Sequence, residues 1–360
     1  MVQSVSVLGF SATTPFGVSA GPLTRDGESV RRWGETPGVG FVVTKTIYSR
    51  DANTPKPTMA KVPGGLINYD WSGTGIDTWL TEYWPSVQAC RVPVILSIAS
   101  RDTQELVDMA ASAEDRGAKA LEVPIPGTFT PREAGLRMER LAAAVRIPVI
   151  PKIGSSLPDT AAFARALVDG GASAISAVNT IGPGVCLDVS TNTMRLGNAR
   201  GYGYLSGAVL KPLALRTVLE IAAAVRVPII GGGGVSTGRD ALEFIMAGAD
   251  LVFVHTAAIL NGPSVFKKIN DECFSLLSQM GMTLCEAKGC AAREFAQKPG
   301  YETVVPRTDP ALCTGCGICV RSCIYDALSL DCNRVSLDAG RCFGCGLCVT
   351  LCPKGALARG

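Results

Sequence analysis

The sequence predicts an α/β protein of two domains: a closed barrel of eight β/α units over residues 1–300 and a small, cysteine-rich α+β domain over residues 301–360. Three observations lead to this prediction. Apolar strand-like runs alternate with helix-like stretches through the first 300 residues, and the strand entries repeat a common pattern. Eight cysteines gather near the C-terminus in two groups of equal spacing.

The strands are predicted from an internal repeat. "CRVPVILSI", "VRIPVIPKI" and "VRVPIIGGG" share an Arg-x-Pro entry into a short β-branched run, and each is followed by a glycine-alanine turn and a second apolar run. Near-continuous apolar runs are typical of parallel strands covered by helices. With "FGVSAG" and "VGFVVTKT" as the first two, we expect strands over residues 16–21, 39–46, 93–98, 119–123, 148–153, 173–178, 227–231 and 250–254.

Helices are predicted between these strands. "DTAAFARALVDG" and "GRDALEFIMAG" have helical periodicity and end in glycine. Eight β/α units over about 270 residues is the size of a (β/α)8 barrel, in which the chemistry lies at the C-terminal ends of the strands. A doubly wound open sheet is the alternative, and the absence of G-x-G-x-x-G after the first strand disfavours it.

The eight cysteines repeat the spacing C-x2-C-x2-C-x3-C, which is typical of bacterial ferredoxins with two 4Fe-4S clusters. In that pattern the fourth cysteine of each run binds the other cluster. One predicted ligand set is Cys313, Cys316, Cys319 and Cys352, and the other is Cys342, Cys345, Cys348 and Cys323. A zinc ribbon is the alternative, but it would leave four thiols unused. Ile324 stands where the first run usually has proline.

The ends of the predicted strands carry residues suited to an anionic cofactor. A four-glycine turn follows the seventh strand, with Gly233 and Gly234 in it, and Thr256 follows the eighth. Glycine amides at these two positions of a barrel favour a phosphate. Lys45 and Lys152 lie within apolar runs at the same end, where an unpaired cation would be costly. A flavin with its phosphate tail would supply the anionic partner.

Several motifs carry a family resemblance. "TKT", "GGLIN", "PKI", "SAVNT", "GYLSGAVLKPLAL" and "PIIGGGGVSTGRDALEFIMAGADLVFVHTA" resemble the FMN barrel of the dihydroorotate dehydrogenase family. A barrel followed by a two-cluster domain resembles the C-terminal part of dihydropyrimidine dehydrogenase. The resemblance implies FMN contacts from Lys45, Lys152, Asn179, Thr180, Ser206, Gly207, Gly233, Gly234, His255 and Thr256. It also implies a substrate contact from Asn68 and a place beside the substrate for Asn179.

The resemblance breaks at the loop after the fourth strand, "LEVPIPGTF". Glu122 takes the place of the family's asparagine, and Ile125 takes the place of its Cys or Ser acid/base. Since isoleucine cannot transfer a proton, we predict that a standard pyrimidine is not the substrate. Glu122 is the first candidate for the proton donor. The alternative is a buried acid paired with Lys152, and Tyr202 and Tyr204 are further donors.

These motifs predict an FMN- and iron–sulfur-dependent oxidoreductase that acts on a CH–CH bond of a small cyclic or conjugated molecule. The expected catalytic residues are Glu122, Asn179, Asn68 and Lys152. Two alternatives are an electron-relay subunit of a larger complex and a dihydropyrimidine dehydrogenase catalytic subunit with a displaced acid/base. No nicotinamide fingerprint is present, so electrons would pass through ferredoxin or a separate NAD(P)H-oxidising flavoprotein subunit.

Composition limits the other possibilities. The chain of 360 residues has a net charge of only +3 and no long basic run, which excludes an electrostatic footprint for nucleic acid. The N-terminal stretch does not read as a signal peptide, and the sequence holds no apolar run of 18 residues. We therefore expect a cytoplasmic protein without membrane segments, which forms a homo-oligomer.

Overall fold

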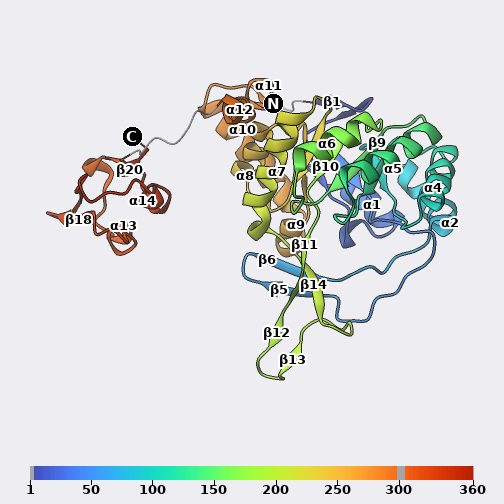
Figure 1. The fold of residues 1–360 in the computed structure, drawn as a ribbon, viewed down its shortest axis with the longest axis horizontal. Coiled ribbons are helices and arrows are strands. Elements are labelled where there is room, and N and C mark those ends of the chain that lie inside the picture. Colours follow the sequence, from blue (N-terminus) through green and yellow to red (C-terminus); the bar gives the residue numbers. More distant parts are fainter. Residues whose placement is uncertain (1–3, 298–304, 360) are drawn as a thin grey trace. The chain divides into compact units, whose positions relative to one another are not determined.

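A computed structural model describes residues 4–297 and 305–359 (Figure 1). The chain divides into two compact units, Met1–Gln297 and Lys298–Gly360. The predicted domain boundary between residues 300 and 301 lies outside the described residues. Each unit is therefore treated by itself below.

The first unit is a closed parallel barrel of eight strands in the order β10-β15-β16-β3-β4-β7-β8-β9. All eight predicted strands are present and the open-sheet alternative is wrong. Their bounds are β3 (Phe16–Val18), β4 (Phe41–Val43), β7 (Val94–Ser97), β8 (Leu121–Pro124), β9 (Val149–Ile153), β10 (Ile175–Ala177), β15 (Ile229–Gly232) and β16 (Leu251–Val254).

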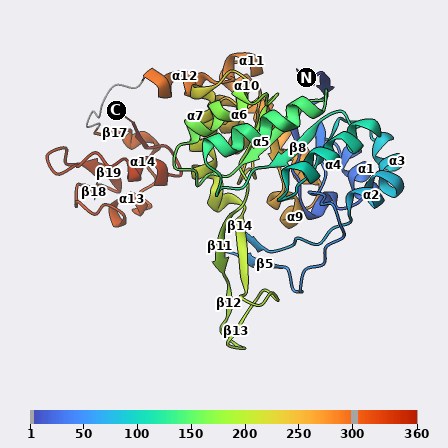
Figure 2. The same cartoon turned by 45° about the vertical axis from the view of Figure 1, so that its right-hand side comes forward.

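Helices follow most of the barrel strands and cover their outer faces (Figures 1 and 2). The longer ones are α1 (Gly27–Gly34), α4 (Thr103–Asp115), α5 (Pro131–Ala144), α6 (Thr160–Asp169), α7 (Lys211–Ala224), α8 (Gly238–Ala247), α10 (Ser264–Gln279) and α12 (Cys290–Gln297). Shorter turns of helix are η1 (Pro22–Thr24), α2 (Ile76–Thr78), η2 (Trp79–Tyr83), α3 (Trp84–Gln88), η3 (Ala208–Leu210), α9 (Thr256–Asn261) and α11 (Leu284–Ala287).

The interior of the barrel is apolar at its N-terminal end. Inward-facing side chains there form a buried cluster with the hairpin of β1 (Val5–Val7) and β2 (Phe10–Ala12). The barrel members of this cluster are Phe41, Val43, Ile95, Ala120, Ile150, Ala174, Ile230, Leu251 and Phe253. Because this end is filled, polar chemistry is confined to the opposite end of the barrel.

An arm of antiparallel strands extends from the C-terminal end of the barrel (Figures 1 and 2). It was not predicted. Its four-stranded sheet has the order β11-β14-β6-β5, with a two-stranded hairpin beyond it. The bounds are β5 (Met59–Val62), β6 (Gly65–Asn68), β11 (Ile181–Val185), β12 (Leu187–Asp188), β13 (Thr193–Met194) and β14 (Tyr202–Ser206).

The second unit is small and built from short elements. Two antiparallel strand pairs, β17 (Arg307–Thr308) with β20 (Leu357–Ala358) and β18 (Leu328–Asp331) with β19 (Arg334–Leu337), flank two short helices and a 3-10 turn. The helical segments are η4 (Pro310–Leu312), α13 (Ile318–Arg321) and α14 (Leu347–Leu351). Its hydrophobic core cluster consists of the buried residues Cys319, Leu328, Val335 and Leu357.

The helices were also searched for membrane spans. Within residues 4–297 and 305–359, no helix combines the length and the apolar character that crossing a bilayer requires.

Candidate functional site

A layer of polar side chains lies directly above the apolar layer inside the barrel. Side chains two residues apart on a strand point to the same face. Ile95, Ala120, Ile150 and Ala174 belong to the apolar interior, so the residues two places further on also point inward, nearer the C-terminal end. Those residues are Ser97, Glu122, Lys152 and Ser176. Strand geometry therefore gathers them in one plane.

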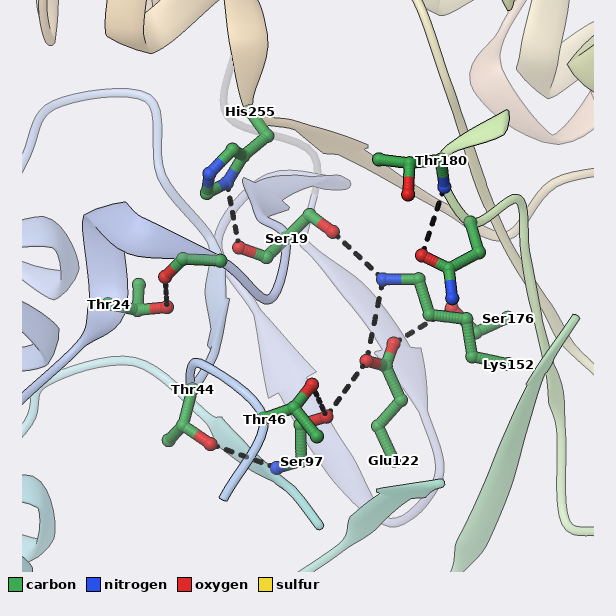
Figure 3. Close-up of polar contacts among 12 residues, drawn as sticks. Ser19, Thr24, Thr44, Thr46, Ser97, Glu122, Lys152, Ser176, Thr180 and His255 are labelled. Carbon is green, nitrogen blue, oxygen red and sulfur yellow. Dashed lines mark hydrogen bonds and ion pairs between the residues drawn. The ribbon is translucent and has the colours of Figure 1, made fainter. Parts of the chain in front are cut away.

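Lys152 and Glu122 form the centre of this layer (Figure 3). The Lys152 ammonium lies 3.5 Å from the Glu122 carboxylate, donates to the Ser19 hydroxyl at 3.1 Å and lies 4.9 Å from the centre of the Phe253 ring. Glu122 also accepts hydrogen bonds from Ser176 at 2.9 Å and Ser97 at 3.3 Å. The exposed fractions of Lys152 and Glu122 are 5% and 1%. A buried pair with these additional hydrogen bonds satisfies both charges.

This geometry changes two sequence-based arguments. Lys152 has a carboxylate partner within the chain, so the cost of an unpaired cation does not call for an outside anion. Glu122 is the buried acid paired with Lys152, as the alternative interpretation held. Ile125, which we predicted to stand at the family's acid/base position, is buried with 6% exposure. Neither side chain offers an accessible acid at the end of β8.

Lys45 has a carboxylate partner of its own. It follows β4 and its ammonium lies 2.7 Å from the Asp70 carboxylate, which comes from the segment after β6. Burial would raise the pKa of Asp70, but the hydrogen bond and the charge of Lys45 outweigh burial and lower it. The Asp70 amide also donates to the Asn68 side chain at 2.8 Å. This pair ties the arm to the mouth of the barrel.

Glycines and hydroxyls from three distant segments meet beside β15 and β16. Thr256 donates a hydrogen bond to the Ser206 hydroxyl at 2.8 Å. A Cβ on Gly207 would lie 3.1 Å from Thr256 Cγ2, and one on Gly234 would lie 2.9 Å from the Gly207 carbonyl oxygen. Gly233 and Gly234 have φ angles of 126° and 95°, which glycine adopts without strain. Ser206, Gly207, Gly234 and Thr256 therefore lie together, next to Gly233. All five residues were predicted to contact a flavin or its phosphate.

His255 lies beside this group. Its Nδ1 atom is 3.0 Å from the Ser19 carbonyl oxygen, while the Nε2 atom is buried and has no partner among the described residues. Burial, together with the nearby Lys152 charge, lowers the pKa of His255 to about 4. The ring is therefore neutral at neutral pH. Its unpartnered nitrogen is available to a polar group bound here.

Asn179 and Thr180 are exposed directly after β10. The Asn179 side-chain oxygen accepts from the Thr180 backbone amide at 2.9 Å. The Asn179 backbone amide donates to the Ile153 carbonyl at 3.0 Å. The first bond orients the side-chain amide. Both residues lie at the same end of the barrel as Lys152.

Sequence analysis missed several members of this site. Ser19, Ser97, Ser176 and Asp70 make the contacts described above, and the Thr46 hydroxyl lies 3.0 Å from that of Ser97. The missed signal is a polar residue two places after an inward apolar residue near the end of a strand, as in Ile95 and Ser97. Asp70 gives no such signal because it lies in the arm.

Eight of the nine cysteines of the second unit line two cavities. One cavity is lined by Cys313, Cys316, Cys319 and Cys352, and the other by Cys323, Cys342, Cys345 and Cys348. Each cavity thus receives three cysteines of one run and the last cysteine of the other, which is the division that the spacing predicted.

Backbone amides support the two exchanged cysteines in the same way. The Ala327 amide donates to Cys323 Sγ at 3.4 Å, and the Ala356 amide donates to Cys352 Sγ at 3.2 Å. Although burial acts in the opposite direction, backbone hydrogen bonds lower the pKa of the Cys352 thiol. Such bonds favour the thiolate, which is the form that binds metal.

The spacing of the thiols also bears on the metal. Across the described part of the chain, no three His, Cys, Asp or Glu side chains are gathered closely enough to bind a single ion. A zinc ion needs all its thiolates at about 2.3 Å, whereas each thiolate of a 4Fe-4S cluster binds a different iron at a different corner. The cavities therefore suit a cluster better than the zinc alternative.

Fold and site together define a class of protein: a (β/α)8-barrel oxidoreductase that carries an iron–sulfur domain. Residues 2–277 match the family described as dihydroorotate dehydrogenase, and residues 312–356 match the 4Fe-4S dicluster domain. The chain belongs to the dihydroorotate dehydrogenase family, whose barrels bind FMN.

Curated relatives agree with this assignment. The chain is similar to the catalytic subunit of dihydroorotate dehydrogenase B (NAD+) from Desulforudis audaxviator, with 32% identity over 81% of this chain and 97% of that protein. The protein of the same name from Methanocaldococcus jannaschii is 30% identical over 79% of this chain and 97% of its own length. That from Geobacillus kaustophilus is 34% identical over 63% and 75%.

Proposed function

We propose that this chain uses FMN to reduce or oxidise a CH–CH bond of a small cyclic or conjugated molecule, and that two 4Fe-4S clusters exchange the electrons with an external protein. The observation that carries the proposal is the presence, in one chain, of two groups of residues suited to bind redox cofactors. One is the polar mouth of the barrel, and the other is the pair of cavities lined by four cysteines each.

The mouth fits a flavin mononucleotide in three respects. Gly233 and Gly234 form a left-handed glycine turn after β15, Thr256 and Ser206 present hydroxyls, and His255 has an unpartnered buried nitrogen. In this proposal Gly233, Gly234, Thr256 and His255 hold the phosphate, while Lys45, Lys152, Ser206, Gly207, Asn179 and Thr180 border the ring. FMN, when bound, would exchange a hydride with the substrate and single electrons with the clusters.

In this proposal the buried pair of Glu122 and Lys152 has a positioning role. Glu122 has three partners, so it holds the Lys152 ammonium in place at the base of the mouth. A fixed cation beside the flavin stabilises negative charge on the ring when electrons arrive. This role replaces that of proton donor, which the sequence alone left open for Glu122.

Tyr204 is the proton donor that we propose in its place. Ser206 points to the barrel, since it bonds to Thr256, and Tyr204 lies on the same face of β14 two residues before it. Asn68 is the register partner of Tyr204, so its side chain shares that face. In this proposal Asn68 and Tyr204 contact a substrate over the mouth.

The substrate in this proposal is not a standard pyrimidine. Ile125, directly after β8, has no proton to transfer, and Glu122 is buried and paired with Lys152. Loss of an acid/base group typically lowers the rate of such a reaction by about 10²–10⁴. The relatives are named for dihydroorotate and NAD+. The family resemblance implies that Ile125 stands at the proton-transfer position in this chain, and the proposal follows that implication. The relay alternative differs in having no substrate of its own.

The first experiment tests the cofactors. Anaerobic purification and analysis should find one FMN and eight irons per chain, since eight cysteines line two cavities. Four irons or fewer, zinc in their place, or FAD would each contradict the proposal.

The second experiment tests the substrate. The reduced enzyme is mixed anaerobically with uracil, thymine, orotate, and a panel of cyclic and conjugated enones and acids, and flavin reoxidation is followed. Turnover of the pyrimidines at rates typical of enzymes would contradict the proposal. Turnover of no compound, with normal cofactor content, would favour the relay alternative.

The third experiment tests the donor. Tyr204→Phe should lower the rate of substrate reduction by about 10²-fold or more, while leaving flavin reduction unchanged. Tyr202→Phe is the matched control, because Tyr202 lies further out on the arm and is 38% exposed. Equal effects of the two variants would remove Tyr204 from the acid role.

The fourth experiment tests the route of the electrons. Cys316→Ser removes a thiol from the first cavity and should leave FMN bound while abolishing flavin reduction by an external one-electron donor. Unchanged flavin reduction would show that electrons reach the barrel directly.

A further inference from the structure

An exposed apolar surface borders the second cysteine cavity. We call Ile324, Tyr325, Phe343 and Leu347 the apolar patch. The exposed fractions of Ile324, Phe343 and Leu347 are 79%, 68% and 46%. The rings of Tyr325 and Phe343 stack with centroids 4.9 Å apart and planes inclined by 20°. Exposed apolar side chains that lie together often mark an interaction site, whereas single scattered ones are common on any protein surface.

The patch and the cavity share residues. Tyr325, Phe343 and Leu347 line the cavity together with Cys323, Cys342, Cys345 and Cys348. Ile324 lies between Cys323 and Tyr325 and does not line the cavity. A protein that covers the patch is therefore separated from the cysteine sulfur atoms by one layer of side chains.

The charges around the patch are few. Asp326 follows Tyr325, and Arg341 pairs with Asp338 at 3.5 Å, which leaves the patch itself without a charge. The first cavity differs, because Lys354 lines it and the Arg321 guanidinium donates to the Cys316 carbonyl at 3.2 Å. Among the described residues, those that line the second cavity include no charged side chain, and the exposed Phe343 and Leu347 suit close contact with a partner.

We propose that the apolar patch is the docking surface for a small one-electron carrier protein of the ferredoxin type. The proposal rests on the proposed function, because it requires a cluster in the second cavity. One electron passes from the reduced carrier to that cluster, so the carrier is oxidised and the cluster is reduced. No bond forms and no proton moves.

The size of the patch selects this occupant. Four side chains make a small contact, and weak electron-transfer encounters bury less than about 1,200 Å², whereas permanent subunits bury about 2,000 Å² or more. A carrier protein that binds briefly, transfers one electron and dissociates needs no larger contact area. Because the patch is uncharged, the transfer rate should also depend little on ionic strength.

The experiment compares two reductants on the complete, cofactor-loaded chain. Stopped-flow absorbance follows cluster reduction by a reduced two-cluster ferredoxin and by the methyl viologen radical. Calorimetry measures the dissociation constant for oxidised ferredoxin, and iron analysis checks the clusters. The variants are Ile324→Ser and Phe343→Ser. Leu312→Ser is the matched control, since Leu312 is an apolar residue of the same unit that is 49% exposed and lines neither cavity.

Ile324→Ser and Phe343→Ser should each slow reduction by ferredoxin and raise its dissociation constant about tenfold. The iron content and the viologen rate of Ile324→Ser should stay within about twofold of wild type. Leu312→Ser should change neither rate. Ile324→Ser decides the outcome if Phe343→Ser loses iron, because Ile324 lies outside the cavity lining.

Several outcomes would overturn the proposal. These are a wild-type chain that ferredoxin does not reduce, variants that bind and react like wild type, equal slowing with both reductants, and loss of a permanently bound subunit from the variants. Failure of the proposed function is distinguishable, because it appears as missing iron or FMN in the wild-type chain.

Discussion

The barrel and the cysteine-rich unit build their sites in different ways. The barrel buries a continuous apolar core between its strands and helices, and each buried lysine at its mouth has a carboxylate from the same chain. The buried core cluster of the second unit has only four members among the described residues, one of which is the cysteine Cys319. The barrel thus forms its site from protein groups alone, while the second unit depends on what its cysteines bind.

This difference follows from size. Burying a large apolar side chain contributes about 1.5–3 kcal/mol, and a domain near 60 residues buries only about 60% of the surface of its unfolded chain, so its apolar core alone makes it marginally stable. Apolar packing therefore stabilises the barrel, whereas metal ligation stabilises the second unit. The predictions below test it, beginning with the largest expected effect.

Removal of iron should unfold the second unit and leave the barrel folded. Metal binding in small domains of this kind supplies folding free energy directly. Limited proteolysis after anaerobic chelation should cut within residues 305–359 at many sites, while residues 4–297 stay protected. All four tryptophans lie before residue 85, so the unfolding curve by tryptophan fluorescence should not change. If the second unit resists proteolysis after its iron is removed, the proposed difference between the two units is wrong.

Glu122→Gln should destabilise the barrel by about 3–5 kcal/mol, because it leaves the buried Lys152 ammonium without its counter-charge. Urea unfolding followed by tryptophan fluorescence measures this change. The double variant Glu122→Gln/Lys152→Met should recover most of the loss, since it removes the uncompensated charge. If the double variant is no more stable than the single one, packing rather than charge pairing holds this layer.

Acid should weaken the barrel through His255. Burial lowers its pKa to about 4 in the folded state, against about 6.5 in the unfolded chain, so the unfolded state binds more protons between these values. The contribution is complete above pH 6.5 and is lost as pH falls towards 4, in total about 3 kcal/mol. His255→Asn should flatten the stability profile of the FMN-free barrel in this window. A profile equal to that of wild type would contradict this assignment.

A smaller acid effect is expected at Asp240, at the start of α8. Burial would raise its pKa, but hydrogen bonds from Lys211 at 2.6 Å and from Ser236 lower it to about 2. The contribution of about 2 kcal/mol is present above pH 4 and is lost as pH falls towards 2. Asp240→Asn should remove it. Glu243→Gln is the control: Glu243 is the partly exposed second partner of Lys211, at 2.9 Å, and its loss should cost under about 1 kcal/mol.

The regular part of the fold could be predicted because its signals are local. Each barrel strand is a short apolar run, and the predicted helix over residues 159–170 corresponds to α6. The division of the cysteines was equally predictable, since their spacing decides which thiols can meet.

The arm and the charge pairs could not be predicted from such signals. The arm forms in two loops far apart in the sequence, after β4 and β10, and β11 includes two glycines and a proline that obscure a strand pattern. Asp70 meets Lys45 only because β6 pairs with β14. The partners of Glu122 come from β7, β9 and β10, so its role depends on barrel closure.

The crossed arrangement of the cysteines has a consequence for assembly. Cys323 belongs to the first run but lines the second cavity, and Cys352 does the reverse. A cluster inserted in either cavity therefore closes the chain loop between the two runs and holds a thiol of the other cavity near its place. The second insertion then costs less conformational entropy than the first. Maturation should accordingly be cooperative, so that chains with one cluster are scarce at every stage of loading.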